Sequence, residues 1–276
     1  MTADAAAGAP PAVLSGQAAS GGLRLELSGR RLDVVLAAPD RRNAQTPATW
    51  RALAAVGAWA AEVADIVVIR GDGPSFSAGL DRRAFSPEGI PGEPGLFQLA
   101  ALPAHELDAT IASYQAGFTV WSDGPFVSVA AIRGHAVGAG FQLALACDLR
   151  IAADDARFAM REPALGLVPD LGGTGALVDA VGYARALEIC ATSRWVEAAE
   201  ASSIGLVQAV VPVSGLAAAT DAFAAAVLAN PAPAVRATRS LLRDAARRTP
   251  AERTAAERLA QGERLRAMAR EAAARS

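Results

Sequence analysis

Short apolar runs alternate with longer amphipathic segments along most of the chain. The short runs have the length and the Val, Ile and Leu content of buried strands, and they fall at residues 23–27, 32–37, 66–70, 126–132, 149–152, 157–160 and 207–211. Helices are expected at 47–64, at 106–121, up to residue 146 after a glycine-rich turn, and three times between 214 and 272. Strands that alternate with helices predict an α/β fold with both faces of the sheet covered.

The two ends and one internal segment depart from this pattern. Residues 1–20 are mainly Ala, Gly, Pro and Ser, without a basic start or an apolar h-region, so we expect a disordered N-terminal extension and no signal peptide. Residues 86–103 are rich in Gly and Pro and predict a mobile loop. We expect a core at 21–212 and a helical C-terminal region at 213–276. The charges at 247–275 alternate at helical spacing, which is typical of a solvated helix.

Composition limits the class of protein. Half of the residues are hydrophobic (52%), a fifth are charged (20%) and the net charge is -2, which excludes disorder of the whole chain and argues against a nucleic-acid binder. All 26 basic residues are arginines. Cys147 and Cys190 have no redox or metal spacing, which favours a reducing cytoplasm. His105 and His135 lie too far apart in the chain to indicate a metal site. We interpret the uncharged stretch 201–220 as soluble core, not as a membrane span.

A glycine-rich turn between a strand and a helix is the first candidate for chemistry. Gly134, Gly138 and Gly140 leave the N–H groups of the following helix unobstructed, and such a helix start suits an oxygen that carries or gains negative charge. The alternative is a turn needed only for close packing. The spacing is not the dinucleotide fingerprint, the chain has no lysine for a Walker loop, and no Gly-x-Ser-x-Gly elbow is present.

A second loop, at 76–81, follows another buried strand. Two strand ends that each deliver one backbone N–H to the same point would form an oxyanion hole. Several motifs stand in a fixed order along the chain: Pro39-Asp40-Arg41-Arg42-Asn43-Ala44, Phe76-Ser77-Ala78-Gly79-Leu80-Asp81, 138–140 with 143–150, and Glu162 with 166–169 and 172–174. Through these motifs the chain resembles the crotonase superfamily, also called the enoyl-CoA hydratase/isomerase family, over residues 22–250.

The resemblance implies a crotonase-like spiral of β-β-α repeats followed by a helical C-terminal region. It also implies a homotrimer or a dimer of trimers, an acyl-CoA thioester as substrate, and no metal or cofactor besides the coenzyme A of the substrate. The oxyanion donors would be the backbone N–H groups of Leu80 and Ala139. Contacts to CoA are expected from Ala78, Asp81, Arg83 and Arg42.

The acid and base residues decide the reaction. A standard hydratase of this family uses two glutamates, and the second of these corresponds to Glu162, whereas the first corresponds to Gln142, which cannot accept a proton. Asp170 resembles a carboxylate of the dienoyl-CoA isomerase branch. We therefore expect catalytic roles for Glu162, Asp170 and Gln142. Double-bond isomerisation is slightly favoured, with an atypical enoyl-CoA hydratase and a non-catalytic acyl-CoA-binding scaffold as the alternatives.

Each of these residues also has a purely structural interpretation. Glu162 follows Arg161 and could pair with it, and Asp170 could cap the next helix. His135 is expected to be a packed or rim residue. The arginines beside the two loops could form a solvated basic surface instead of a phosphate site. The loop 86–103 and the helix after it are expected to set the choice of acyl group.

Overall fold

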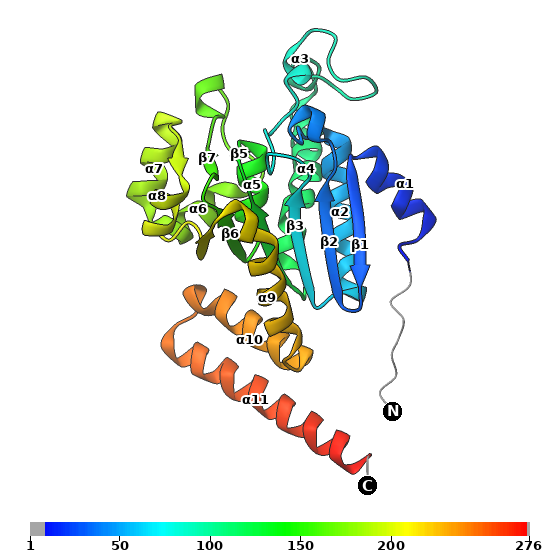
Figure 1. Cartoon of the computed structure of the whole chain (residues 1–276), viewed down its shortest axis with the longest axis vertical. Helices are drawn as coiled ribbons and strands as arrows, with labels where there is room; N and C mark the ends of the chain where they lie inside the picture. The colour runs from blue at the N-terminus through cyan, green and yellow to red at the C-terminus, as the bar shows by residue number, and fades with distance from the viewer. Residues whose placement is uncertain (1–8, 275–276) are drawn as a thin grey trace. The chain divides into compact units, whose positions relative to one another are not determined.

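The computed structural model describes residues 9–274, and its strands form two sheets (Figure 1). In the larger sheet, one antiparallel hairpin at the edge is followed by parallel neighbours. Its strands, in spatial order, are β1 (Leu23–Ser28), β2 (Arg31–Leu36), β3 (Ile66–Gly71), β4 (Val127–Ile132), β6 (Leu149–Ala153) and β9 (Ala209–Val211). Every strand expected in this sheet is present, with ends displaced by two residues at most.

The smaller sheet consists of β5 (His135–Val137), β7 (Arg157–Ala159) and β8 (Val196–Glu197). The loop after β3 extends it, because Ser77 forms a parallel bridge with Ala136. A strand of the large sheet, a strand of the small sheet and a helix thus follow one another, as in β4, β5 and α5 (Ala139–Ala146). This arrangement matches the expected β-β-α unit, and it brings the loops after β3 and β4 together.

Two long helices pack closely against each other beside the large sheet, α2 (Pro47–Val63) and α4 (Ala104–Asp123). Helix α2 begins where it was expected, because Thr46 caps it in a capping box with Thr49 and Pro47 occupies the first turn. A Cβ at Gly117 of α4 would lie 2.4 Å from the carbonyl oxygen of Trp50, so only glycine permits this approach.

The expectation of a disordered segment over 1–20 is wrong for its second half. Residues Ala12–Ser20 form helix α1, whereas residues 1–8 lie outside the described part of the chain. Leu14 and Ala18 are one helical turn apart and buried, and the helix packs against α2 and β1. The segment has low complexity but is rich in alanine, and alanine has the highest helix propensity.

The remaining helices of the first part of the chain surround the small sheet or interrupt loops. They are α3 (Leu96–Ala100), α6 (Gly173–Val181), α7 (Tyr183–Thr192) and α8 (Ala198–Ser203). Short 3-10 turns, η2 (Arg82–Phe85) and η3 (Pro163–Leu165), follow the first glycine loop and Glu162. Helix α3 lies within the segment 86–103, which was expected to be a loop throughout.

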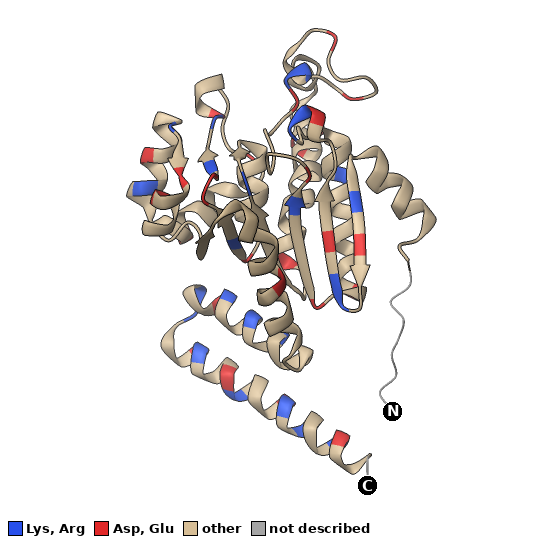
Figure 2. Cartoon of the chain, in the orientation of Figure 1, with Lys and Arg blue, Asp and Glu red and all other residues tan. Residues whose placement is uncertain are grey.

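The chain divides into two compact units, Met1–Ala222 and Phe223–Ser276. The three expected C-terminal helices are α9 (Leu216–Leu228), α10 (Ala232–Asp244) and α11 (Pro250–Ala273). Helix α11 has no buried residue and carries charges of both signs (Figure 2), in agreement with a solvated helix. Within residues 9–274, no single helix is both long and apolar enough to cross a membrane; only the bent pair Val213–Leu228 and Ala232–Arg247 meets those criteria, taken together.

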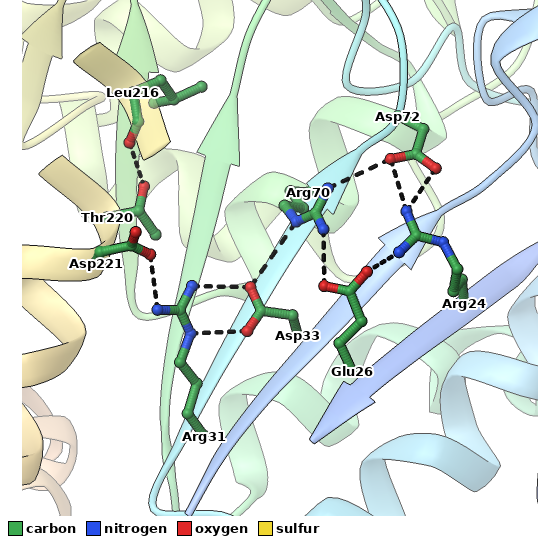
Figure 3. A network of polar contacts seen from close by, with 9 residues as sticks. All are labelled: Arg24, Glu26, Arg31, Asp33, Arg70, Asp72, Leu216, Thr220 and Asp221. Carbon is green, nitrogen blue, oxygen red and sulfur yellow. Dashed lines mark hydrogen bonds and ion pairs between the residues drawn. The ribbon is translucent and has the colours of Figure 1, made fainter. Parts of the chain in front are cut away.

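A chain of ion pairs crosses the strands of the hairpin edge (Figure 3). Arg70 on β3 binds Glu26 of β1 at 3.0 Å and Asp33 of β2 at 3.8 Å. Arg31 of β2 binds Asp33 at 2.7 Å and reaches Asp221 of α9, also at 2.7 Å. The pairs therefore connect three strands with the first turns of α9.

Candidate active site

Ser77 fixes the first glycine loop in place. Its hydroxyl donates to the carbonyl of Asn43 at 2.7 Å and accepts from Gly79 N–H at 3.2 Å and from the Gln45 amide at 3.1 Å. Its backbone N–H and C=O pair with β5. A buried side chain with this many partners has one conformation, so the loop that follows it is rigid.

The backbone N–H of Leu80 is left free by this pairing. Gln45 accepts from Asp81 N–H at 2.8 Å and donates to the carbonyl of Gly79 at 2.7 Å, so it bonds the residues on either side of Leu80. In a parallel bridge, the residue between two bonded neighbours turns its own polar groups away. Within residues 9–274, the Leu80 N–H has no acceptor. It is a candidate donor to a ligand.

A second free N–H belongs to Ala139, the first residue of α5. The first N–H groups of a helix have no partner inside the helix. The preceding Gly138 has φ 51°, which turns the chain sharply from β5 into the helix and favours glycine. No acceptor for the Ala139 N–H is found among the described residues.

The two loops touch each other. A Cβ on Gly79 would lie 2.5 Å from the carbonyl oxygen of Val137 and 3.4 Å from the nitrogen of Ala139. A Cβ on Gly140 would lie 2.6 Å from the carbonyl oxygen of Ser77. The backbones beside the two N–H groups therefore meet without side chains between them, which is the close approach that two donors to one oxygen require.

Glu162 lies directly beside this point, because a Cβ on Gly138 would lie 3.1 Å from its Oε1. Oε1 accepts a hydrogen bond from Gln142 Nε2 at 2.7 Å, whereas Oε2 is buried and has no partner among the described residues. Burial raises the pKa of Glu162 above its ordinary value, and the negative charge of Asp170 raises it further. Glu162 forms no ion pair with Arg161, whose guanidinium donates to the carbonyl of Ser193.

Gln142 holds Glu162 in this orientation. Its side chain is buried in α5, and Oε1 accepts from the N–H groups of Leu171 at 2.9 Å and of Gly173 at 3.3 Å. Since backbone N–H groups can only donate, they fix the amide so that Nε2 points at Glu162. Gln142 corresponds to the first glutamate of a standard hydratase. In this chain it connects the start of α6 with Glu162 through hydrogen bonds.

Asp170 does not cap the next helix. The N-cap of α6 is Gly172, and no side chain caps it. Burial raises the pKa of Asp170. Its backbone carbonyl accepts from Gln115 of α4 at 2.7 Å, which connects this turn to the long helix. The negative charge of Asp170 is one cause of the raised pKa of Glu162.

Some of these residues border a cavity of about 940 Å³. Its lining includes Glu162, Leu80 and Gly138, together with Ala164, Leu165, Leu167 and Trp195. Gln142, Ala139 and Asp170 are not among the residues that line it. His135 lines it as well, in edge contact with Trp195, as expected of a rim residue. Trp195 and the leucines were not foreseen, because nothing in their local sequence marks them.

Arginines gather where the loop after β3 meets the cavity. Asp81 binds Arg83 at 2.8 Å and Arg41 at 2.6 Å. The hydrogen bonds from Arg83 lower the pKa of Asp81 to about 2, and Arg41 adds to this effect. Arg42 also lines the cavity, as does Ala78. Asp81, which was expected to contact CoA, orients the guanidinium groups of Arg41 and Arg83. Guanidinium groups are suited to bind phosphate.

Residues 31–271 match the family profile described as "Enoyl-CoA hydratase/isomerase". The fold is similar to that of a "putative enoyl-CoA hydratase" from Thermobifida fusca YX in complex with CoA, with 46% identity and a TM-score of 0.88 over 96% of this chain and 99% of that chain. A second structure of that name, in complex with acetoacetyl-CoA, has 48% identity and a TM-score of 0.87 over 91% of this chain and 97% of that one.

Curated relatives match over shorter regions. The "Probable enoyl-CoA hydratase echA8" of Mycobacterium bovis is 41% identical over 109 residues, which are 40% of this chain and 42% of that protein. The "Delta(3,5)-Delta(2,4)-dienoyl-CoA isomerase, peroxisomal" of Arabidopsis thaliana is 33% identical over 145 residues, 52% of this chain and 51% of that protein. The chain thus spans about half, or less, of the length of these curated relatives.

Proposed function

The chain belongs to the enoyl-CoA hydratase/isomerase family, and from this premise we propose that it is an enzyme acting on an unsaturated acyl-CoA thioester. The thioester oxygen would accept hydrogen bonds from the N–H groups of Leu80 and Ala139. Each such donor contributes about 3 kcal/mol in a transition state in which that oxygen gains negative charge. The resulting enolate is the common intermediate of hydration and of double-bond isomerisation in this proposal.

One observation favours isomerisation: among the described residues that line the cavity, one carboxylate is available for proton transfer. Asp81 also lines the cavity, but its negative charge is held between Arg41 and Arg83. Glu162 has a raised pKa and one oxygen that no described residue binds, which suits a group that first takes and then returns a proton. Its neighbour Gln142 is a neutral amide and cannot share that task.

The proposed reaction moves a double bond from C3 to C2 of the acyl group. Glu162 removes a proton from C2, the electrons pass into the thioester oxygen, and the same carboxyl returns the proton at C4. No water is consumed and no redox change occurs. Asp170 assists by keeping the pKa of Glu162 high, so that the protonated carboxyl remains a usable acid at neutral pH.

The second candidate is an atypical hydratase, favoured by the names of the Thermobifida and mycobacterial relatives. In this case Glu162 would take the proton of a water, and the Gln142 amide or Asp170 would orient that water. A third candidate is a scaffold that binds acyl-CoA without turnover. It gains nothing from burying Glu162 with an unpartnered oxygen, since burial of a carboxylate is costly.

Product analysis separates these candidates. Panels of 2-enoyl-, 3-enoyl- and 3,5-dienoyl-CoA esters are incubated with the protein in heavy water and examined by mass spectrometry. A moved double bond with deuterium exchange but no added water supports isomerisation, whereas addition of a whole water to 2-enoyl-CoA establishes hydration and refutes our preference. Binding without any reaction favours the scaffold.

For the CoA portion we propose that Arg41, Arg42 and Arg83 face the phosphates, with Ala78 alongside.

We also propose a trimer-based assembly, which is supported by exposed apolar side chains on α11, namely Leu259, Leu265 and Met268. Light scattering on the purified protein tests the assembly. The two thiols are free, which fits the cytoplasm as the compartment, and no metal is required by the proposed steps.

A further inference from the structure

Helix α5 carries the Ala139 N–H at one end and meets a buried arginine at the other. It has eight residues, which gives it a length of about 12 Å. At its C-terminal end, Arg150 donates from Nη1 to the carbonyl of Cys147 at 2.9 Å and, more weakly, to that of Ala144 at 3.4 Å. Nε donates to the carbonyl of Leu206 at 2.7 Å.

The charge of Arg150 is unusual in its surroundings. The residue is only 6% exposed, and among the described residues its guanidinium has no carboxylate at ion-pair distance. The carboxylate of Asp148 acts on it electrostatically and accepts a hydrogen bond from the N–H of Ser128 at 2.9 Å. All the partners of the guanidinium are backbone carbonyls, so it acts on the carbonyl end of α5 with its full positive charge.

A helix has a negative pole at its carbonyl end, and in a short helix this pole lies close enough to weaken the positive pole at the other end. We propose that Arg150 is a positioning residue that neutralises the carbonyl end of α5 and thereby strengthens the Ala139 N–H as an oxyanion donor. This inference rests on the proposed acyl-CoA function. The length of α5 puts the charge on the order of 15 Å from the Ala139 N–H, and a unit charge at that distance through protein changes the stability of an anion by about fivefold.

Acetoacetyl-CoA is a suitable probe, because its enolate absorbs in the near ultraviolet and places negative charge on the oxygen that the N–H groups would bind. The enolate signal is titrated against pH for the ligand bound to the native protein and to Arg150→Gln. We expect the apparent pKa of the bound ligand to be about 0.7 higher in the variant, the equivalent of fivefold weaker enolate stabilisation. Arg150→Lys, which keeps the charge, should restore most of the difference.

A second variant tests the same inference in case Arg150→Gln does not fold. Asp148→Asn removes the opposing charge near Arg150 and keeps an oxygen for the Ser128 N–H, so it should lower the apparent pKa of the bound enolate. Arg30→Gln, at a half-exposed ion pair with Asp65 on the β1–β2 turn, is the control and should leave the pKa of the bound ligand unchanged. Thermal unfolding of every variant is recorded beside the titration, because a purely structural role would alter stability and leave the ligand pKa unchanged.

The outcomes separate this inference from the proposed function. If the native protein does not lower the pKa of acetoacetyl-CoA on binding, the proposed function fails. If the native protein lowers it, but folded Arg150→Gln titrates like the native protein or Asp148→Asn gives no shift, Arg150 only holds the structure together and the inference is overturned. Opposite shifts in the two variants, with rescue by lysine, support it.

Discussion

Glu162 combines burial, a partnerless oxygen and a fixed position next to two free N–H groups. Replacing it by glutamine removes the proton-transfer group with little change in shape. We expect Glu162→Gln to lower kcat on the order of 10³-fold, the usual contribution of a general acid–base group. Affinity for acetoacetyl-CoA should stay within about twofold, since the donors of the oxyanion hole are main-chain groups. Steady-state kinetics and calorimetry measure the two quantities.

A surface carboxylate provides the control for that experiment. Glu188 of α7 pairs with Arg194 at 2.5 Å and is not among the residues that line the cavity, so Glu188→Gln should leave kcat unchanged. If Glu162→Gln retains native kcat, proton transfer must pass through another group, and Asp170 becomes the first candidate.

The pH dependence of the reaction follows from the environment of Glu162. The carboxylate form is the base, so kcat/KM rises as pH increases through the pKa of Glu162. Because burial and Asp170 raise that pKa, the acidic limb should lie above the range of an exposed glutamate. Asp170→Asn removes the repelling charge and should move the limb to lower pH. A limb that stays in place in this variant would show that Asp170 does not act on Glu162.

Gln142 separates the two candidate reactions. Gln142→Glu introduces a second carboxylate facing Glu162, which should raise the pKa of Glu162 by like-charge repulsion and favour two-carboxylate activation of water. We expect the variant to gain hydration of 2-enoyl-CoA and to lose isomerisation at least tenfold, as measured by product analysis. Gln142→Met, which holds no water and no carboxylate, should lose both activities, because Glu162 is no longer held in place.

At the level of elements, the proposed oxyanion hole depends on the close approach of the loop after β3 to the turn between β5 and α5. Gly79→Ala would place a Cβ 2.5 Å from the carbonyl oxygen of Val137 and force the two loops apart. We expect kcat/KM to fall about 10²-fold or more, which corresponds to the loss of one donor. The control is Gly29→Ala, at a residue that also has positive φ but open space around it.

Both glycine variants carry the backbone strain of positive φ, on the order of 1 kcal/mol. They should therefore lose similar amounts of unfolding free energy from strain, and only Gly79→Ala should lose activity. Equal kinetic effects of the two substitutions would mean that the activity loss reflects strain and not separation of the loops.

The sequence alone predicted the strands, the long helices and the residues at the two glycine loops, because each leaves a local signal: an apolar run, a cap such as Thr46, or a glycine at a strand end. It failed for α1, whose Leu14 is buried only because α2 offers a surface for it. It also could not show that Asp81 is held by Arg41 from another segment, or that Gln142 connects Glu162 with α6. Such pairings depend on distances that only the fold establishes.

For the molecule as a whole, the chain of ion pairs in Figure 3 joins the hairpin edge to the start of α9. Arg31 contacts the largely buried Asp33, whereas Asp221 is mostly exposed. Arg31→Gln should therefore lower the free energy of unfolding by about 1–2 kcal/mol, and Asp221→Asn by less than about 1 kcal/mol, since exposed pairs are screened by water. Urea unfolding measures both, and a larger loss for Asp221→Asn would contradict this ranking.

The same ion pairs affect how the molecule behaves next to its own copies in a concentrated solution. Among the described residues, β1 has a strand neighbour on one side only, and an edge strand of this kind can pair with a strand from another molecule. Its exposed positions include Arg24 and Glu26, both of which are engaged with charges on neighbouring residues. A strand that docked there would place its own side chains beside these pairs and remove water from their charges. The charged pairs thus oppose strand pairing at the hairpin edge.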